Sequence, residues 1–146
     1  MAKLTKFTFV SDRKQEKSDF HFPLLRLPDI MLIYAEAVNE LNAGPDAEAY
    51  RQINRIRTRV NATPFSGMNQ DEFRSAVLEE RARELAYEAD RRYDLFRWGI
   101  YLDVMNAIDM DEHNVTKRRL ERNLLYPIPT SEVNSNDKID VNNPGW

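Results

Sequence analysis

The 146-residue chain contains no cysteine, only two histidines and only four glycines, and each scarcity removes a class of site. Without cysteine there can be no disulfide, thiolate zinc site or cysteine nucleophile. The serine-nucleophile elbow, the phosphate loop and the dinucleotide fingerprint all need several glycines, and none of these motifs is present. His21 and His113 lie far apart and neither belongs to a Glu-x-x-His pattern. We therefore expect no cofactor and no metal.

Long apolar runs and an excess of positive charge are also missing. No stretch approaches the roughly 18–20 apolar residues of a membrane-spanning helix, and a net charge of −3 disfavours nucleic acid as a partner. Residues 1–5 carry neither an apolar export segment nor a lipidation cysteine. The chain as it stands is expected to be soluble, with any export signal upstream of Met1. Its hydrophobic and charged fractions, 42% and 31%, are typical of a globular domain.

Hydrophobic periodicity predicts an all-α fold that begins with a helical hairpin. One helix is expected to start near Pro28-Asp29 and to end at Gly44-Pro45, and a second to run from there to about Asn61. The first helix has one apolar stripe, formed by Ile30, Ile33, Tyr34, Ala37, Val38 and Leu41. The length of the pair is close to the repeat of about 34 residues in tetratricopeptide proteins.

Further helices are expected after this hairpin. A third helix is predicted over residues 70–89, with apolar positions on two faces and therefore covered on two sides, interrupted at residues 90–92. A short helix is predicted over 101–108, and Thr130 or Ser131 should cap a single turn. Extended segments are expected at residues 6–10 (a strand), 20–25 and 124–129, where aromatic, β-branched or proline residues gather.

Three carboxylates, Glu80, Glu84 and Glu88, recur one helical turn apart in the third helix, and glutamates at this spacing repel one another. Their separation of about 6 Å along a helix is compatible with a glycosidase pair. Side chains on one rod point the same way, however, and nearby arginines favour the ionised form, which is the wrong state for a general acid. We therefore assign no catalytic residue, and a glycosidase remains the less favoured alternative.

The structural interpretation of this row is a lattice of ion pairs. Glu79 or Glu80 can reach Arg83, and Glu88 can reach Arg91 or Arg92, at the favourable three- and four-residue spacings. Arginine also suits partly buried carboxylates because its planar fork donates several hydrogen bonds. This interpretation predicts a scaffold element.

Two other groups of residues resemble binding sites. Asp109, Asp111 and His113 begin like a calcium loop, but the sixth position has no glycine and the twelfth, Leu120, has no carboxylate. A set of aromatic residues could stack on sugar rings, although at helical spacing such residues more often belong to the core: Tyr93, Phe96, Trp98, Tyr101 and Trp146.

Six segments, taken in order, resemble motifs of the C-terminal region of the SusD/RagB family of outer-membrane nutrient-binding lipoproteins. They are LRLPDIMLIYAEA (25–37), INRIRTR (53–59), ERARELAYE (80–88), RYDLFRWG (92–99), YPIP (126–129) and NPGW (143–146). The family patterns are LRYADVLLMYAEA, INxVRxRA, ERRRELAFE, RWFDLVRWG, LFPIP and QNPGY. Three positions depart from them: Pro28 stands for a frequent alanine, Ala82 for an arginine, and Ala89-Asp90 for a frequent Gly-His, which removes an expected glycine turn.

The resemblance implies that residues 1–146 form a single partial domain of a longer protein. Family members bind glycans or peptides above a TonB-dependent transporter of the SusC type, and they are lipid-anchored at the cell surface. Their tetratricopeptide-like helices form a scaffold facing the transporter, and their ligand contacts lie largely outside these motifs. The ligand-binding residues of this chain are therefore unknown from its sequence.

We expect a non-enzymatic nutrient-uptake component, represented by its C-terminal scaffold. A free-standing helical-repeat protein-interaction module is the alternative, and exposed apolar surface would favour self-association.

Overall fold

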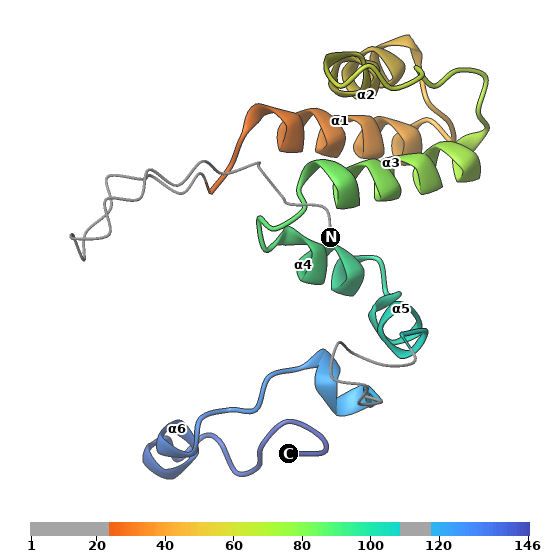
Figure 1. Ribbon diagram of the computed structural model, residues 1–146. Coiled ribbons are helices and arrows are strands. Elements are labelled where there is room, and N and C mark those ends of the chain that lie inside the picture. Colours follow the sequence, from red (N-terminus) through yellow and green to blue (C-terminus); the bar gives the residue numbers. More distant parts are fainter. Residues whose placement is uncertain (1–23, 109–117) are drawn as a thin grey trace, which may run out of the picture. The chain divides into compact units, whose positions relative to one another are not determined.

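The computed structural model describes residues 24–108 and 118–146 (Figure 1). Within these residues the fold is all-α, as predicted, and contains no strand. The chain divides into two compact units, Met1–Gln70 and Asp71–Trp146. The predicted strand at 6–10 and most of the extended segment at 20–25 lie outside the described residues. The elements are α1 (Leu27–Leu41), α2 (Ala47–Arg59), α3 (Gln70–Glu84), α4 (Asp90–Arg97), α5 (Tyr101–Asn106), the 3₁₀ helix η1 (Glu121–Leu124) and α6 (Thr130–Ser135).

In the first unit, α1 and α2 pack side by side as the predicted helical hairpin (Figure 1). Pro28 occupies the first turn of α1, where its missing N–H is not needed for the helix. Asp46 caps α2, and its carboxylate accepts a hydrogen bond from the Ala49 N–H at 2.7 Å. The buried apolar side chains of the pair include Leu32 from α1 and Ile53 from α2. The two helices and their short connection were predicted from the sequence, whereas the capping role of Asp46 is seen only in the structure.

The apolar stripe predicted for α1 is present, but in the structure it faces outward. Ile30, Tyr34 and Leu41 are exposed, whereas Leu32 and Ala35 on the other side of the helix are buried. The helix is therefore apolar on two faces, and only one of them is covered within the described residues.

Polar side chains of α2 fix the loop that follows this helix. Asn54 donates from Nδ2 to the Phe65 carbonyl at 2.9 Å and accepts from the Phe65 N–H at 2.7 Å. The Arg57 guanidinium lies 3.7 Å from the centroid of the Phe65 ring, a cation–π contact. The Tyr50 hydroxyl accepts from the Met68 N–H at 2.7 Å. The INRIRTR motif therefore contains two of the residues that hold this loop.

The third helix is shorter than predicted, because α3 ends at Glu84 and not at residue 89. Tyr87 and Ala89 adopt left-handed backbone conformations, with φ of 67° and 70°. A residue in that region cannot continue a right-handed helix. The interruption expected at residues 90–92 therefore lies at 85–89, and α4 begins at Asp90.

The C-terminal segment is held together by hydrogen bonds between residues 122–128 and residues 142–146. Asn142 accepts from the Ile128 N–H at 2.7 Å and donates to the Ile128 carbonyl at 3.0 Å. The Trp146 Nε1–H donates to the Arg122 carbonyl at 3.0 Å. Gly145 has φ of 87°, and a Cβ there would lie 2.8 Å from the Arg122 Cβ, so this position requires glycine. Asn143 Nδ2 also donates to the Tyr126 carbonyl at 2.7 Å, and this hydrogen bond joins the NPGW motif to the YPIP motif.

The Asn54 clamp predicts a measurable loss of stability. Asn54→Ala should lower the free energy of unfolding by about 1–3 kcal/mol relative to Thr58→Ala, because two hydrogen bonds to Phe65 disappear. Thr58 is an exposed position one turn further along α2, and asparagine and threonine have similar helix propensities. Urea unfolding followed by circular dichroism measures the difference. Equal stability of the two variants would show that the clamp contributes nothing.

The left-handed conformation of Ala89 predicts the opposite effect for a glycine substitution. Ala89→Gly should raise the free energy of unfolding by about 0.5–1 kcal/mol, because glycine relieves backbone strain but also gains freedom in the unfolded chain. Ala82→Gly, inside α3, should instead lower it by roughly 0.5–1 kcal/mol. Thermal melts of both variants check the signs. A loss of stability in both would mean that residue 89 is not strained.

Candidate functional site

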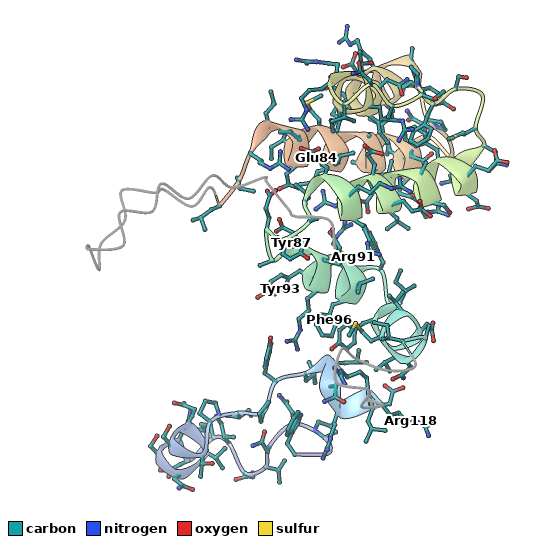
Figure 2. All side chains as sticks on the ribbon, in the orientation of Figure 1. Glu84, Tyr87, Arg91, Tyr93, Phe96 and Arg118 are labelled. Atoms are coloured by element: carbon teal, nitrogen blue, oxygen red, sulfur yellow. The ribbon has the colours of Figure 1, made fainter. Side chains whose placement is uncertain are left out.

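The three glutamates of the predicted row occupy different parts of the second unit. Glu80 is buried within α3, Glu84 is the last residue of that helix, and Glu88 is buried in the connection to α4. Figure 2 labels Glu84 and, beyond it, Tyr87, whose left-handed backbone separates Glu88 from the helix. The expectation of three carboxylates on one helical rod is therefore wrong for Glu88.

Part of the predicted ion-pair lattice is present around Arg83. Its guanidinium contacts the Glu79 carboxylate, and Arg83 Nη1 lies 3.7 Å from Oε2 of Glu80. Since Glu79 and Arg83 are both mostly exposed, their pair contributes at most about 1 kcal/mol. The predicted contact of Glu88 with Arg91 or Arg92 stays a prediction.

A buried ion pair between α3 and α4 was missed by the sequence analysis. Arg81 Nε lies 2.9 Å from Oδ2 of Asp94, and the two side chains are only 5% and 7% exposed. The other oxygen of Asp94 lies 3.2 Å from Nη2 of Arg97, a partly exposed side chain. Arg81 and Asp94 stand thirteen residues apart in two different motifs, so no helical spacing links them. This pair ties the start of the aromatic segment to the glutamate-rich helix.

Aromatic rings and arginines gather where α4 meets α5. The rings of Phe96 and Tyr101 stack, with centroids 4.3 Å apart and planes inclined by 17°. The Arg92 guanidinium lies 5.2 Å from the Phe96 centroid and 4.6 Å from that of Tyr126. Arg91 lies on the Trp98 ring at 5.8 Å. These contacts connect α4, α5 and the extended YPIP segment through cation–π attraction.

The aromatic residues weighed as sugar platforms do not share one environment. Tyr101 is buried, and Phe96 and Trp98 are half-buried, as expected of core residues. Tyr93 is 67% exposed and Trp146 is 48% exposed. Figure 2 shows Tyr93 and Arg91 directed to different sides of α4, and Phe96 directed toward α5. The core interpretation therefore holds for Tyr101 and not for Tyr93.

A hollow of about 520 Å³ lies beside the aromatic stack. Its volume is within the usual range of small-molecule sites, about 300–1,000 Å³. The rings of Phe96 and Tyr101 offer apolar contact there. The carboxylates of Asp103 and Glu121 can accept hydrogen bonds from hydroxyl or amino groups. The lining residues are Phe96, Gly99, Tyr101, Leu102, Asp103, Glu121 and Leu124. Sequence analysis singled out two of them, Phe96 and Tyr101. The sequence did not predict that Asp103 and Glu121 line a common site, because they belong to two short elements, α5 and η1, without a shared motif.

Residues 24–108 and 118–146 contain neither a cluster of metal ligands nor a helix that could span a membrane. In that part of the chain, no three histidine or acidic side chains gather as metal ligands would. The calcium-like positions 109–113 lie outside it. The helices described there are all too short or too polar to span a bilayer.

Comparison with known proteins identifies the family. The model of the SusD family matches residues 1–146, and the chain belongs to this family. SusD-like protein P25 of Formosa agariphila is 39% identical over 130 residues, which are 84% of this chain and 24% of that protein. The starch-binding protein SusD of Bacteroides thetaiotaomicron is 33% identical over 127 residues, or 85% of this chain and 21% of that protein.

Solved structures give the same result for the fold. The crystal structure of a SusD homolog from Bacteroides thetaiotaomicron matches with a TM-score of 0.72 at 34% identity, covering 84% of this chain and 26% of that one. A SusD superfamily protein from Parabacteroides distasonis also gives 0.72, at 29% identity, covering 89% of this chain and 28% of that one. The chain thus spans about a quarter of these relatives, which fits the predicted C-terminal region.

The buried ion pair predicts a large effect of a small substitution. Asp94→Asn should lower the free energy of unfolding by about 3–5 kcal/mol, because it leaves the Arg81 charge buried without its anionic partner. Asp71→Asn provides the matched control, since Asp71 contacts Arg74 at the surface and such pairs contribute at most about 1 kcal/mol. Denaturant unfolding of both variants separates the two values. Similar small losses in both would contradict a buried pair.

Proposed function

We propose that this chain is the scaffold portion of a non-enzymatic, glycan-binding component of a nutrient-uptake system. The observation that carries this proposal is the match of the SusD family to the whole of residues 1–146. A relative named for starch binding supports glycan as the class of ligand. The ligand in the complete protein is an oligosaccharide or a peptide.

The geometry supports a scaffold rather than a catalytic centre. Glu80 is buried beside Arg83, and Asp94 holds Arg81 between α3 and α4. Asn54 binds the backbone of the following loop. The polar residues of these motifs are therefore engaged in fixing the chain. A carboxylate that takes part in such a contact is poorly suited to protonate a substrate.

The proposed partner is a TonB-dependent outer-membrane transporter of the SusC type. The complete protein is anchored by lipid at the cell surface, and residues 1–146 act as one partial domain that faces this transporter. Family membership favours this assignment over a free-standing helical-repeat module.

A co-purification experiment tests this function. The tagged chain is expressed together with the SusC-type transporter whose gene lies nearest its own, and complexes are captured after the outer membrane is solubilised. We expect the transporter to be recovered with the chain at least tenfold above a tagged, unrelated helical-repeat protein. Equal recovery with both baits would overturn the proposed partnership.

A further inference from the structure

The helix α2 has one buried apolar face and one strongly basic face. Ile53 and Ile56 are buried on the first. Arg51, Arg55 and Arg59 follow one another at four-residue steps on the other side of the helix, and all three are exposed. Because an α-helix rises about 1.5 Å per residue, successive arginines stand about 6 Å apart along the helix. These three residues are called the arginine stripe below.

The positive charge of the arginine stripe is poorly compensated within α2. The only acidic side chain among residues 47–59 is Glu48, which contacts Arg51 at one end of the stripe. Like charges four residues apart on a helix repel one another. Arg59 lies in the last turn, where a cation suits the helix dipole, but Arg55 gains nothing from that position. The stripe is therefore a local excess of positive charge on a chain whose formal net charge is −3.

The arginines of α2 differ in what they bind. Arg57 donates from Nε to the Thr63 carbonyl at 2.6 Å and lies on the Phe65 ring, so it fixes the following loop. Arg55 makes no hydrogen bond, ion pair or ring contact within the part of the chain that the structure describes. Its guanidinium therefore keeps its five N–H donors for water or for a partner from outside the chain.

A shallow hollow of about 450 Å³ lies over the arginine stripe. It is lined by Arg51, Asn54, Arg55, Thr58 and Arg59. The Asn54 amide is already bound to the backbone of Phe65, so the hollow offers guanidinium groups and one hydroxyl. A planar guanidinium donates two parallel hydrogen bonds to an acidic group such as a carboxylate. Since no apolar residue lines the hollow, its chemistry selects an anion.

We propose that the arginine stripe is a surface site for an anionic oligosaccharide, whose sugars carry carboxylate or sulfate groups. Successive acidic groups of the saccharide bind successive guanidinium groups, and the Thr58 hydroxyl exchanges a hydrogen bond with a sugar hydroxyl. This inference rests on the proposed glycan-binding function and adds the charge class of the glycan.

The shape of the arginine stripe favours a linear acidic chain over a membrane surface. Three arginines in line along one helix span about 12 Å. An anionic lipid surface is typically recognised by a cluster of about four to eight lysines and arginines. At about 0.1 M salt, charges more than about 10 Å away are largely screened, so the acidic remainder of the chain does not prevent binding at the stripe.

Titration calorimetry of the 146-residue chain with three saccharides of equal length tests the proposal. The probes are hexagalacturonate, which carries carboxylates, sulfated maltohexaose and neutral maltohexaose. We expect at least one acidic probe to bind at least tenfold more tightly than maltohexaose, and its affinity to fall when the NaCl concentration is raised to about 0.3 M. The two acidic probes distinguish carboxylate from sulfate as the bound group. No preference for either acidic probe over maltohexaose would overturn the proposal.

Substitution of Arg55 locates the bound anion. Arg55→Gln should weaken binding of the preferred acidic probe at least fivefold, and Arg55→Glu should abolish it. Arg118→Gln is the matched control, because Arg118 is also exposed, belongs to the second unit and has no partner among the described residues. It removes the same charge and should leave the affinity within twofold. Equal weakening by Arg55→Gln and Arg118→Gln would show an effect of net charge alone and would contradict a site on α2. The circular dichroism spectra of all variants should match that of the parent chain.

A lipid surface is tested with vesicles of phosphatidylglycerol. If the chain binds these vesicles more tightly than the acidic saccharides, and Arg55→Gln removes that binding, a membrane occupies the stripe and the proposal is overturned. The proposed function is tested separately by recovery of the transporter. A chain that is recovered with the transporter but shows no preference for acidic saccharides would leave the proposed function intact and would overturn only the anionic site.

Discussion

The second unit depends on one buried interaction, the ion pair of Arg81 and Asp94. Two charges removed from water lose hydration, and their mutual attraction compensates only if the geometry is good. The chain must therefore bring the middle of α4 close to α3 through a short connection. Left-handed residues at Tyr87 and Ala89 accomplish this reversal. Without glycine at residue 89, the connection stores backbone strain that the pair and the neighbouring contacts must offset.

Directed polar contacts also fix other segments of the chain, here through the neutral side chains of asparagine. Asn54 and Asn142 each bind both the N–H and the carbonyl of one distant residue, as a strand neighbour would. Asn106 does the same for Arg119, with bonds of 3.0 and 2.6 Å. Side-chain amides can do this because each offers a donor and an acceptor. The described residues contain no strand, and these amides pair with backbone groups that a neighbouring strand would pair with in a sheet.

Sequence predicted the elements whose signals are local. The α1–α2 hairpin follows from the Pro28-Asp29 start and from the Gly44-Pro45 stop, which act within a few residues. The end of α3 could not be predicted, because residues 85–89 contain neither glycine nor proline. The Arg81–Asp94 pair and the contact of Trp146 with Arg122 depend on tertiary geometry, which no periodicity encodes.

For the candidate site, the sequence predicted the aromatic residues but not which side chains lie together around the hollow. Phe96 and Tyr101 were recognised as candidates, while their stacking and the nearby carboxylates of Asp103 and Glu121 depend on how α5 and η1 fold. Periodicity also found the outward stripe of α1, but it does not state which of two apolar faces the same chain covers. The sequence of a helix shows which of its faces are apolar, but it does not show which other element packs against each face.

The distribution of residues over inside and outside now has a physical explanation. Charged side chains such as Arg81, Asp94 and Glu80 are buried, while Leu25, Leu41 and Tyr126 are exposed. Burial of apolar area still drives folding here, through side chains such as Leu32, Ile53 and Phe73, which are fully buried. Here directed polar contacts fix the local geometry, and much of the apolar surface remains available.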